Sequence, residues 1–472
     1  MSNRERRTAQ FLLRMNSQVP LRHISMDITI KDCRPAARKY RPVLICLAFG
    51  FCVIGVLSMT SPLYSYNPWP DANIYLTTTR QMLRGKMLYR DVFDHKGPYL
   101  YLIHIPAVLI SQWSFFGVYI IESLFAAAFA LISLKITHSK TVKKTVLTLI
   151  GCLAVYGTRA FAKSDSAEEY CLPLLMASFY ALETDSYFLT GAMAGCIFWT
   201  KMTMCSYYIG WYIVMLQRHG MNAVKKTPEI AAGLLVASVP ALIMFVSDLN
   251  ILWDGYITSN IYYGLTGEPA RCLSFEFRLL GILNDFYRII IPVFLTVPVI
   301  FLDRKRGSAV FVTWVCLFVP IICVNPFMGK YYYLVLAMYA PLWSDIRFRC
   351  RKIVTVLIIG SALLTGNIKN IGHPVYQMKF VNIIKKDPGR VFEYGILDYG
   401  FYTLMHQNPD NRFFFYPNML RSDITKDQRK ELKSGKYKYI VTRAEIGAPY
   451  KKVATTCFDN KGEYFFLYKR NE

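Results

Sequence analysis

The segment between positions 69 and 98 contains several ionisable side chains, among them Asp71, Arg90, Asp91, Asp94, His95 and Lys96. The segment directly follows the apolar run 43–60, which is close to the roughly 20 residues that a membrane-spanning helix needs. Carboxylates, a histidine and basic groups at such a place predict chemistry at a membrane surface.

Asp71 is the first candidate catalytic residue. It precedes a predicted amphipathic helix, 72–83, in which Arg80 and neighbouring Arg84 oppose an apolar face, so the helix would lie flat on the membrane. A carboxylate at the start of this helix would meet the lipid headgroups, where a general base acting on a lipid-linked substrate has to be. The alternative interpretation makes Asp71 a solvated carboxylate or the N-cap of the helix.

Lys96 is the first candidate anion-binding residue. It stands two residues before Pro98, which favours an extended approach followed by the first turn of a helix. An ammonium group beside the free N–H groups of a helix start predicts a phosphate site. Alternatively, Lys96 anchors the chain at the membrane interface. Arg90 could join Lys96 in stabilising a charged leaving group.

A metal site is a further interpretation of the same segment. The spacing Asp91-x-x-Asp94-His95 allows a divalent cation to bind, but it is not diagnostic of one. A leaving-group route through Lys96 and Arg90 needs no metal. We therefore expect neither a metal nor another cofactor.

A second polar cluster follows the run 146–161 and contains Ser164, Asp165, Ser166, Glu168 and Glu169. Two adjacent carboxylates at a helix start could merely complement the helix dipole. However, Lys201 ends the apolar run 188–200 and falls on the same predicted face of the membrane as the cluster. Charges of both signs therefore converge on one side of the bilayer, which anchoring alone does not require.

Apolar runs recur along most of the chain. Hydrophobic residues make up 54% of the 472 positions and mean hydropathy is +0.26, so a soluble protein would need an unusually large core. The runs are 43–60, 146–161, 172–181, 188–200, 204–216, 230–246, 289–302, 309–324, 331–343 and 353–365. The segment 99–136 is long enough for two helices with a break near 111–117, of which we expect one to be re-entrant or interfacial. The chain is predicted to be a polytopic α-helical membrane protein.

Basic residues predict the orientation. The segment 1–42 is strongly basic and therefore cytoplasmic, which places 61–98 and everything after about 367 outside a cell (plasma) membrane. The formal charge of +24 then indicates attraction to anionic membrane lipids and not nucleic-acid binding. The transmembrane domain is predicted to span 43–366.

Composition changes after residue 365. The segments 391–394, 412–416, 437–442 and 464–468 are predicted strands because they are rich in aromatic and β-branched residues. Helices are predicted at 401–407 and 427–433. Residues 367–472 are therefore predicted to form a small extracytoplasmic α/β domain, which either caps the membrane part or binds the acceptor.

The order of these motifs resembles that of the GT-C membrane glycosyltransferases. The likeness is closer to the branch of protein O-mannosyltransferases and aminoarabinose lipid A transferases, and to bacterial cell-wall polysaccharide or teichoic acid glycosyltransferases. The motifs that carry it are Asp71 with Tyr75 four residues on, Leu83-Arg-Gly85, Tyr89-Arg-Asp91, Lys96-Gly-Pro98, Ser164-x-Ser-x-Glu168-Glu-Tyr170, Gly191-x-x-x-Gly195 with Lys201, and Lys330-Tyr-Tyr-Tyr with Pro341.

The resemblance implies a GT-C fold with about 11–13 transmembrane helices. It implies inverting transfer of a sugar from a polyprenyl-phosphate donor to a cell-envelope glycan or lipid acceptor on the outer face. Asp71 matches the family's catalytic Asp, and Lys96 matches the lysine that holds the donor phosphate. Either Glu168 or Glu169 matches a second carboxylate that orients acceptor or sugar, and Asp94 and Tyr75 are further candidates for that role. Many relatives have Asp-Glu where this chain has Asp71-Ala.

Two other functions compete with this one. A flippase or transporter of lipid-linked saccharides would need polar residues near the bilayer midplane, whereas the predicted spans are nearly free of charge there. A polysaccharide polymerase would favour large Arg-rich loops, whereas the loop 248–278 holds only Arg271 and Arg278.

Overall fold

The computed structural model describes residues 30–162, 164–263, 276, 287–324, 330–347, 349–365, 367–417, 419, 421–458 and 463–471. The chain divides into two compact units, residues 1–44 and residues 45–472. Residues 1–29 of the predicted cytoplasmic segment 1–42 lie outside the described residues, and the elements that could carry chemistry belong to the second unit.

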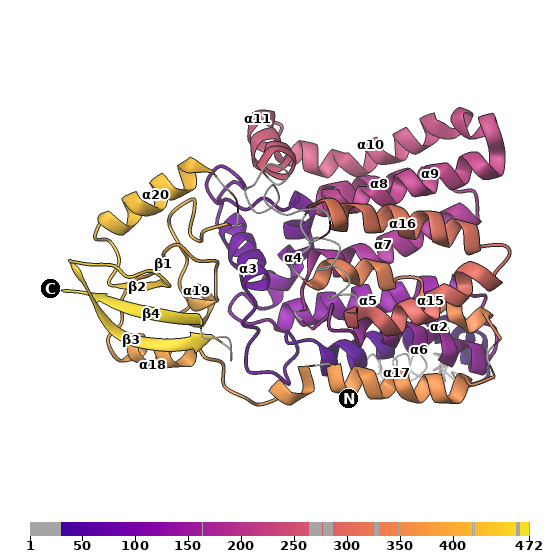
Figure 1. Cartoon of the computed structure of the whole chain (residues 1–472), viewed down its shortest axis with the longest axis horizontal. Coiled ribbons are helices and arrows are strands. Elements are labelled where there is room, and N and C mark those ends of the chain that lie inside the picture. Colours follow the sequence, from indigo (N-terminus) through magenta and orange to yellow (C-terminus); the bar gives the residue numbers. More distant parts are fainter. Residues whose placement is uncertain are drawn as a thin grey trace, which may run out of the picture. The chain divides into compact units, whose positions relative to one another are not determined.

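Helices make up most of the chain (Figure 1). In chain order they are α2 (Ile30–Leu57), α3 (Pro70–Leu83), α4 (Pro98–Ile110), α5 (Phe116–Ile136), α6 (Val142–Tyr156), α7 (Ala167–Glu183), α8 (Tyr187–Thr200), η1 (Met202–Cys205), α9 (Ser206–His219), η2 (Gly220–Lys226), α10 (Thr227–Met244), α11 (Leu249–Leu252), η3 (Trp253–Tyr263), η4 (Tyr287–Ile289), α15 (Ile290–Leu302), α16 (Gly307–Val324), η5 (Lys330–Ala337), η6 (Ala340–Asp345), α17 (Arg351–Thr365), η7 (Asn367–Asn370), α18 (Met378–Lys386), α19 (Phe401–Leu404) and α20 (Ser422–Lys433).

Several of these helices are apolar enough for a bilayer. Within the described residues, four stretches are also long enough to cross it: Tyr40–Leu57, Phe116–Ile136, Met202–Met244 and Arg351–Asn370. Shorter apolar helices cover Pro98–Ile110, Tyr187–Thr200, Tyr287–Leu302 and Gly307–Phe318. The break predicted near 111–117 is present between α4 and α5. The chain is a helical membrane protein, while the expected number of spans and their orientation stay predictions.

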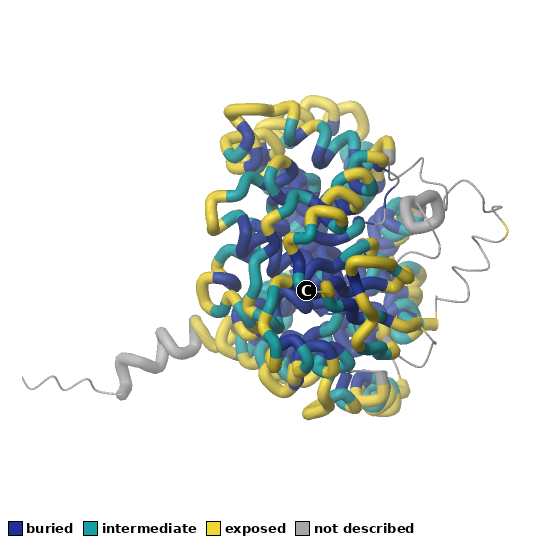
Figure 2. Tube along the Cα trace, turned by 90° about the vertical axis from the view of Figure 1, so that its left-hand side faces the viewer, coloured by how far each residue is buried: buried dark blue, intermediate teal, exposed yellow. Residues whose placement is uncertain are grey.

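Small residues bring the membrane helices into close contact. An added Cβ at Gly191 of α8 would lie 1.8 Å from the Ile230 carbonyl oxygen of α10, and one at Gly233 would lie 2.1 Å from the Phe188 oxygen. Packing between helix backbones drives association in lipid, where the hydrophobic effect between helices is weak. The Gly191-x-x-x-Gly195 motif thus packs α8 on α10. Buried positions occupy the inside of the bundle and exposed ones its rim (Figure 2).

The C-terminal domain contains one mixed sheet, in the strand order β1-β2-β4-β3. Strands β1 and β2 are parallel, whereas β4 is antiparallel to both of its neighbours, β2 and β3. The bounds are β1 (Val391–Glu393), β2 (Tyr439–Thr442), β3 (Tyr450–Phe458) and β4 (Glu463–Arg470). The predicted strands 391–394, 437–442 and 464–468 therefore correspond to β1, β2 and β4, and the predicted helices 401–407 and 427–433 overlap α19 and α20.

The predicted strand 412–416 is wrong, because this segment forms turns. Its aromatic residues are buried outside the sheet: Phe413 packs on Phe93 of a loop, and Phe414 packs on Tyr402 of α19. Strand β3 was not expected, since its lysines and threonines lack the apolar pattern of a buried strand. It lies at the sheet edge, where charged side chains protect against strand pairing between molecules.

Helix α3 lies between the helical bundle and the C-terminal domain (Figure 1). Arg80, predicted to lie on the polar face of this helix, is only 1% exposed. Its Nε donates to Asn408 Oδ1 at 2.9 Å, its Nη1 donates to the Gln112 carbonyl at 2.9 Å, and its guanidinium lies 4.1 Å from the Trp113 ring centre. The polar face of α3 is therefore buried by protein and not open to water, and the orientation of this helix on the membrane stays a prediction. The C-terminal domain covers the polar face of this helix.

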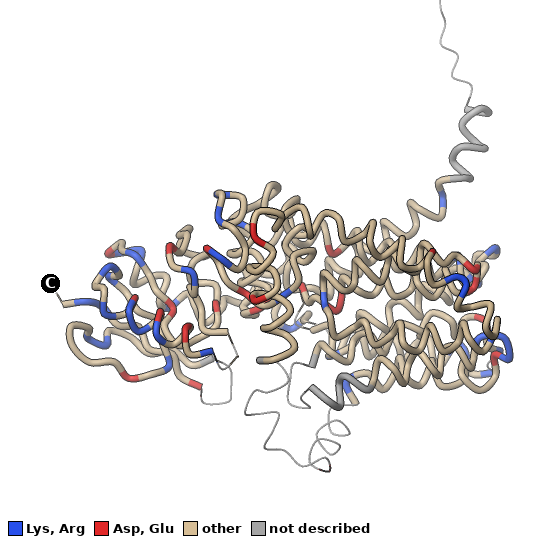
Figure 3. The backbone as a smooth tube through the Cα atoms, turned by 90° about the horizontal axis from the view of Figure 1, so that it is seen from above, with Lys and Arg blue, Asp and Glu red and all other residues tan. Residues whose placement is uncertain are grey.

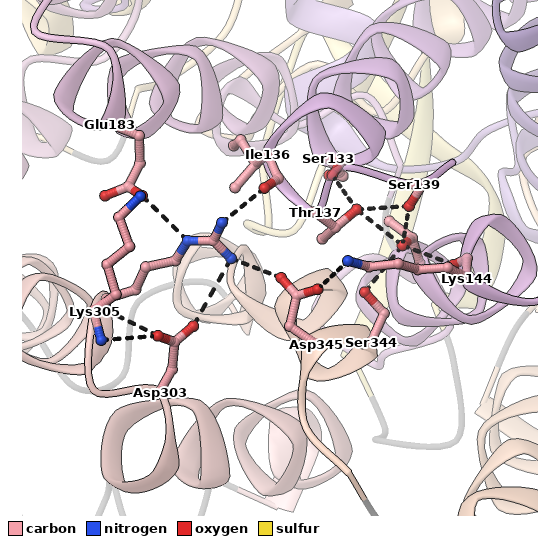
Figure 4. Close-up of polar contacts among 12 residues, drawn as sticks. Ser133, Ile136, Thr137, Ser139, Lys144, Glu183, Asp303, Lys305, Ser344 and Asp345 are labelled. Atoms are coloured by element: carbon pink, nitrogen blue, oxygen red, sulfur yellow. Dashed lines mark hydrogen bonds and ion pairs between the residues drawn. The ribbon is translucent and has the colours of Figure 1, made fainter. Parts of the chain in front are cut away.

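Charged residues gather in the C-terminal domain and at the ends of the helices (Figure 3). At one end, Arg306 is 7% exposed and contacts three carboxylates (Figure 4). Its Nη1 lies 2.6 Å from Asp345 and 3.8 Å from Asp303, and its Nε donates to Glu183 at 3.2 Å. Lys144 adds a 2.6 Å ion pair to Asp345. We call these five residues the Arg306 cluster.

Candidate active site

Asp71 lies in the first turn of α3. This helix begins with Pro70, and the fixed φ of proline suits the first position of a helix. Trp69 is the N-cap, so the interpretation of Asp71 as the cap is wrong. The Asp71 carboxylate is partly exposed and accepts a hydrogen bond from the Tyr331 hydroxyl at 3.1 Å. Tyr331 also packs edge-on against Trp69. Asp71 is thus held by aromatic residues at the start of the helix and stays accessible.

The loop before α4 orders Asp94, His95 and Lys96 by hydrogen bonds. Asp94 accepts from the His95 backbone N–H at 2.7 Å and from the Tyr101 hydroxyl at 2.5 Å. Asn260 of η3 donates to the His95 carbonyl at 2.6 Å, and Tyr89 to the Lys96 carbonyl at 2.6 Å. Because both carbonyls of this short segment are engaged, its side chains are fixed in direction.

Gly97 explains how this loop reaches the end of α8. An added Cβ there would lie 2.0 Å from the Trp199 carbonyl oxygen, so only glycine allows the two backbones to touch. The same contact brings Lys201, which follows α8, within electrostatic range of His95. The sequence therefore places Gly97 where the α4 start and the α8 end meet.

Three basic side chains converge here. The Lys96 ammonium lies 3.0 Å from His95 Nε2, so this nitrogen accepts a hydrogen bond from Lys96. The proton of the neutral ring is then on Nδ1, which lies 3.2 Å from Asp94 Oδ1. Burial, together with the charges of Lys96 and Lys201, lowers the pKa of His95, which keeps the ring neutral. Burial alone would raise the pKa of Asp94, but the His95 hydrogen bond and nearby positive charges hold it at about 2.

Glu168 and Glu169 point to different surroundings at the start of α7. Glu168 Oε1 lies 3.1 Å from Lys201 Nζ, which also donates to the Tyr332 hydroxyl at 3.1 Å. Glu169 instead interacts with Glu122 and with Asp165. Both glutamates are fully buried. Only Glu168 therefore belongs to the group of side chains around Lys201.

A buried network supports this helix start. His104 Nδ1 lies 2.7 Å from the Leu100 carbonyl and its Nε2 lies 2.9 Å from Asp165 Oδ1. Tyr170 donates to the same Asp165 oxygen at 2.6 Å, and the Asp165 N–H donates to Glu122 at 2.5 Å. Asp165 has φ of 55°, a left-handed conformation that side chains other than glycine rarely adopt. The network thus holds a strained turn directly before α7.

Tyr75 joins the two halves of the site. It is one turn after Asp71 on α3, 1% exposed, and packs on Tyr101 and His104. Burial, reinforced by Asp71 among other nearby groups, raises the pKa of Tyr75 well above its ordinary value. Its hydroxyl therefore keeps its proton and can act as a hydrogen-bond donor.

The structure does not place the predicted residues Arg90 and Lys330 in the group around Lys96 and Lys201. Arg90 forms its ion pair with adjacent Asp91 at 2.9 Å, and 57% of its side chain is exposed. The Lys330 side chain lies outside the described residues. Among the residues that the structure describes, no group of three or more His, Cys, Asp and Glu is arranged to hold a metal ion.

Sequence reasoning gave no individual role to Lys201, Tyr331, His104 or Asp165. Lys201 carried a usable signal, because a lysine that interrupts apolar sequence is costly in a membrane unless it has a partner. The contacts of Tyr331 and His104 join segments distant in sequence, so neither residue has a local signature.

No protein-family model matches the sequence, and no curated protein matches it significantly. Two solved structures of ArnT from Cupriavidus metallidurans do match the fold, each with 10% sequence identity and with 92% of this chain and 98% of that chain covered. The TM-score is 0.61 for ArnT bound to undecaprenyl phosphate and 0.63 for the apo state. The chain therefore has the GT-C membrane fold of ArnT, in agreement with its motifs.

Proposed function

We propose that this protein is a membrane glycosyltransferase that uses a polyprenyl-phosphate-linked sugar. The observation that carries the proposal is an accessible carboxylate, Asp71, in the same GT-C fold site as Lys96, His95 and Lys201. The fold is shared with an ArnT that binds undecaprenyl phosphate, which supports a lipid-linked donor. A flippase needs no general base beside a phosphate-binding group, so this arrangement favours transfer.

Asp71 acts as the general base in the proposed reaction. Its carboxylate removes the proton from an acceptor hydroxyl while that oxygen attacks the anomeric carbon of the donor sugar. The bond between the anomeric carbon and the phosphate oxygen breaks on the opposite face, so the configuration inverts. Tyr331, which donates to Asp71 at 3.1 Å, orients the carboxylate.

Lys96 and Lys201 hold the donor phosphate and stabilise the charge that develops on it as it leaves. Lys96 is 8% exposed and Lys201 7%, so their charges act with little screening by water. His95 is neutral and accepts from Lys96, which keeps the ammonium group in place. Arg90 forms an ion pair with Asp91, and its role in binding the donor phosphate stays a prediction.

Glu168 orients the acceptor or the sugar. Its Oε1 forms the ion pair with Lys201, and its Oε2 has no hydrogen-bond partner among the described residues. A sugar hydroxyl can donate to such an oxygen. Asp94, by contrast, is occupied by His95 and Tyr101, and positions the loop. Glu169 lies on the Glu122 side, so Glu168 is the stronger of the two candidates.

The proposed acceptor is a cell-envelope glycan, such as a teichoic acid, or a lipid, on the outer face of the membrane. The C-terminal domain covers α3 and leaves the Asp71 end of that helix next to the membrane part, which suits a large acceptor. The arginines of the loop 248–278, on which the polymerase alternative depends, are Arg271 and Arg278, and both lie outside the described residues.

The test is sugar transfer by the purified protein from short-chain polyprenyl-phosphate sugars to envelope acceptors. Asp71→Asn keeps the size of the side chain but removes its proton affinity, so turnover should fall by roughly 10²–10⁴ with folding preserved. Asp91→Asn, in the same segment but partly exposed and paired with Arg90, is the matched control and should stay near parental activity.

The outcomes separate the rival functions. Near-parental turnover of Asp71→Asn would overturn the assignment of the base. Use of diphosphate-linked oligosaccharides alone would indicate a polymerase. In cells lacking the chain, a missing envelope substituent with a raised donor pool indicates a transferase, whereas a flippase would leave the donor trapped on the inner face.

A further inference from the structure

A small cavity lies away from Asp71 and Lys96, between α6, the start of α15 and α17. Its volume is about 150 Å³. The lining residues are Ala154, Gly157, Thr158, Arg159, Tyr287, Arg288, Ile290, Ile291, Pro292, Ile358 and Ser361. The helices are tightly packed beneath it, since an added Cβ at Gly157 would lie 2.5 Å from the Ala362 side chain. The cavity is therefore set into a firm part of the bundle.

Two arginines and one aromatic ring form the polar side of this cavity. Arg159 Nη1 donates to the Tyr287 hydroxyl at 3.2 Å, and the Arg159 guanidinium lies 5.4 Å from the centre of the Tyr287 ring. The Arg288 guanidinium lies 4.9 Å from the same ring centre. An anion in the cavity would thus meet two guanidinium groups, whose planar donors match phosphate oxygens.

The other side of the cavity is apolar and continues onto the outside of the bundle. Ile290 is 58% exposed, and the exposed residues Phe294 and Leu357 continue the surface along α15 and α17. Exposed apolar side chains on membrane helices face the acyl chains of lipids. A phosphate site placed directly beside such a surface fits an amphiphile better than a water-soluble phosphate.

The location is at the end of the bundle that also carries the candidate active site. Arg159 lies three residues after the end of α6, and the chain reaches Glu168 in the first turn of α7 nine residues later. Asn367 ties the intervening segment to the bundle, because its Nδ2 donates to the carbonyls of Ala162 at 2.9 Å and Leu57 at 3.0 Å. This end is where the headgroup layer meets the helices.

We propose that Arg159, Arg288 and Tyr287 bind the headgroup of an anionic phospholipid whose acyl chains lie along α15 and α17. The phosphodiester accepts hydrogen bonds from the guanidinium groups, and the glycerol part occupies the cavity. Basic pockets between membrane helices take anionic lipids in this way. The site is separate from the donor phosphate site at Lys96 and Lys201, and it does not depend on the proposed reaction.

A bound lipid would also steady the segment that leads into α7. Arg159 begins this segment, and the strained Ser164–Asp165 turn, with φ of 64° and 55°, ends it. The competing explanation is that the two arginines only anchor the helices at the interface, where long basic side chains extend to water. Anchoring requires no particular lipid, so the two explanations differ in lipid selectivity.

The test is native mass spectrometry of the full-length protein with phosphatidylglycerol or phosphatidylcholine added. We expect phosphatidylglycerol to be retained selectively and to bind about 10- to 100-fold more weakly to Arg159→Gln and to Arg288→Gln, as loss of a charge-assisted hydrogen bond predicts. Arg159→Lys, which keeps the charge without the planar donors, should be intermediate. Arg84→Gln removes an exposed arginine that does not line the cavity and should bind like the parent.

Three outcomes would overturn the proposal. They are equal retention of the two lipids by the parent, an equal loss in Arg84→Gln, and competition between phosphatidylglycerol and a polyprenyl-phosphate sugar for one site. Circular dichroism checks that each variant is folded. If Arg159→Gln does not fold, Arg159→Lys and Arg288→Gln decide the question, since unchanged selectivity in both would also overturn it.

Discussion

Arg306 and Lys201 are both basic, both 7% exposed, and both paired with a glutamate of α7, but at opposite ends of that helix. Arg306 meets three carboxylates and the Ile136 carbonyl, at 2.9 Å. Lys201 meets one carboxylate, Glu168, whose second oxygen, Oε2, has no hydrogen-bond partner within the described part of the chain. One end of the bundle is saturated with internal partners, and the other retains acceptors.

We interpret the difference as two uses of the same residue types, namely stability at the Arg306 end and, in the proposed function, binding at the Lys201 end. A buried charge is costly unless it is paired and hydrogen-bonded, so a saturated cluster fixes the helices that contribute to it. At the Lys201 end, strain at Ser164 and Asp165 accompanies the unused acceptors. Strain and unused polar groups together are typical of sites whose remaining partners come from a ligand.

Arg306→Met should have the largest effect on stability. It removes the common partner of Glu183, Asp303 and Asp345, and loss of one member of a buried ion pair costs up to about 3–5 kcal/mol. The cost stays below a full loss of pairing because Glu183 keeps Arg218 and Asp345 keeps Lys144. We expect a lower melting temperature in detergent and less folded protein. The specific activity of the protein that does fold should stay near parental, because this cluster lies at the other end of α7.

Lys305→Met is the matched control for Arg306→Met. Lys305 is 75% exposed on its side chain and lies 3.7 Å from Glu183, so its ion pair is screened by water and should contribute little. Equal destabilisation by both substitutions would contradict the view that burial makes Arg306 important. A fall in specific activity of folded Arg306→Met would contradict the division of the two ends.

The sequence predicted those parts that leave a local signature. The break between α4 and α5 and the strands β1, β2 and β4 follow from hydropathy and from β-branched or aromatic runs. The amphipathic pattern predicted α3 from residue 72, two residues after its start at Pro70, but it did not predict the surroundings of the helix. Arg80 looks like a surface residue in any local window, and only the distant Asn408 and Gln112 reveal that it is buried.

The candidate site was predictable to a similar degree. Asp71 and Lys96 stand in polar segments next to apolar spans, so composition alone singles them out. The choice between Glu168 and Glu169 needed the structure, because neighbouring residues on a helix point about 100° apart and the sequence does not say which one faces Lys201. The environment of each glutamate depends on partners, Lys201 and Glu122, that lie more than thirty residues away.

Asp94→Asn should have the next largest effect and a distinct pH dependence. The pKa of Asp94 is lowered to about 2 from an ordinary 3.8, which corresponds to about 2 kcal/mol in favour of the folded state at neutral pH. This contribution is present above pH 3.8 and is lost as the pH falls toward 2. The variant should therefore melt lower than the parent at pH 7, and the difference should shrink as the pH falls below about 4.

Thermal melting of the two proteins at pH 7, 5 and 3 measures this. Asp91→Asn is the control, because its ion pair with Arg90 is exposed and should add little to stability. A difference between Asp94→Asn and the parent that is the same at every pH would show that the lost contact, and not the charge of Asp94, is responsible.

Lys96→Ala should show the smallest of these effects and the most selective one. The ammonium group contacts His95 and no carboxylate in the described chain, so its removal leaves no buried charge unpaired, unlike Arg306→Met. We expect folding to persist while KM for a polyprenyl-phosphate sugar rises about tenfold, the effect of losing one charge-assisted contact to a phosphate. Lys96→Arg keeps the positive charge near the helix start and should lose less. Steady-state kinetics at limiting donor, with melting temperatures of each variant, measure both quantities. Unchanged KM in Lys96→Ala would return this lysine to a role as an interface anchor and leave Lys201 as the phosphate ligand.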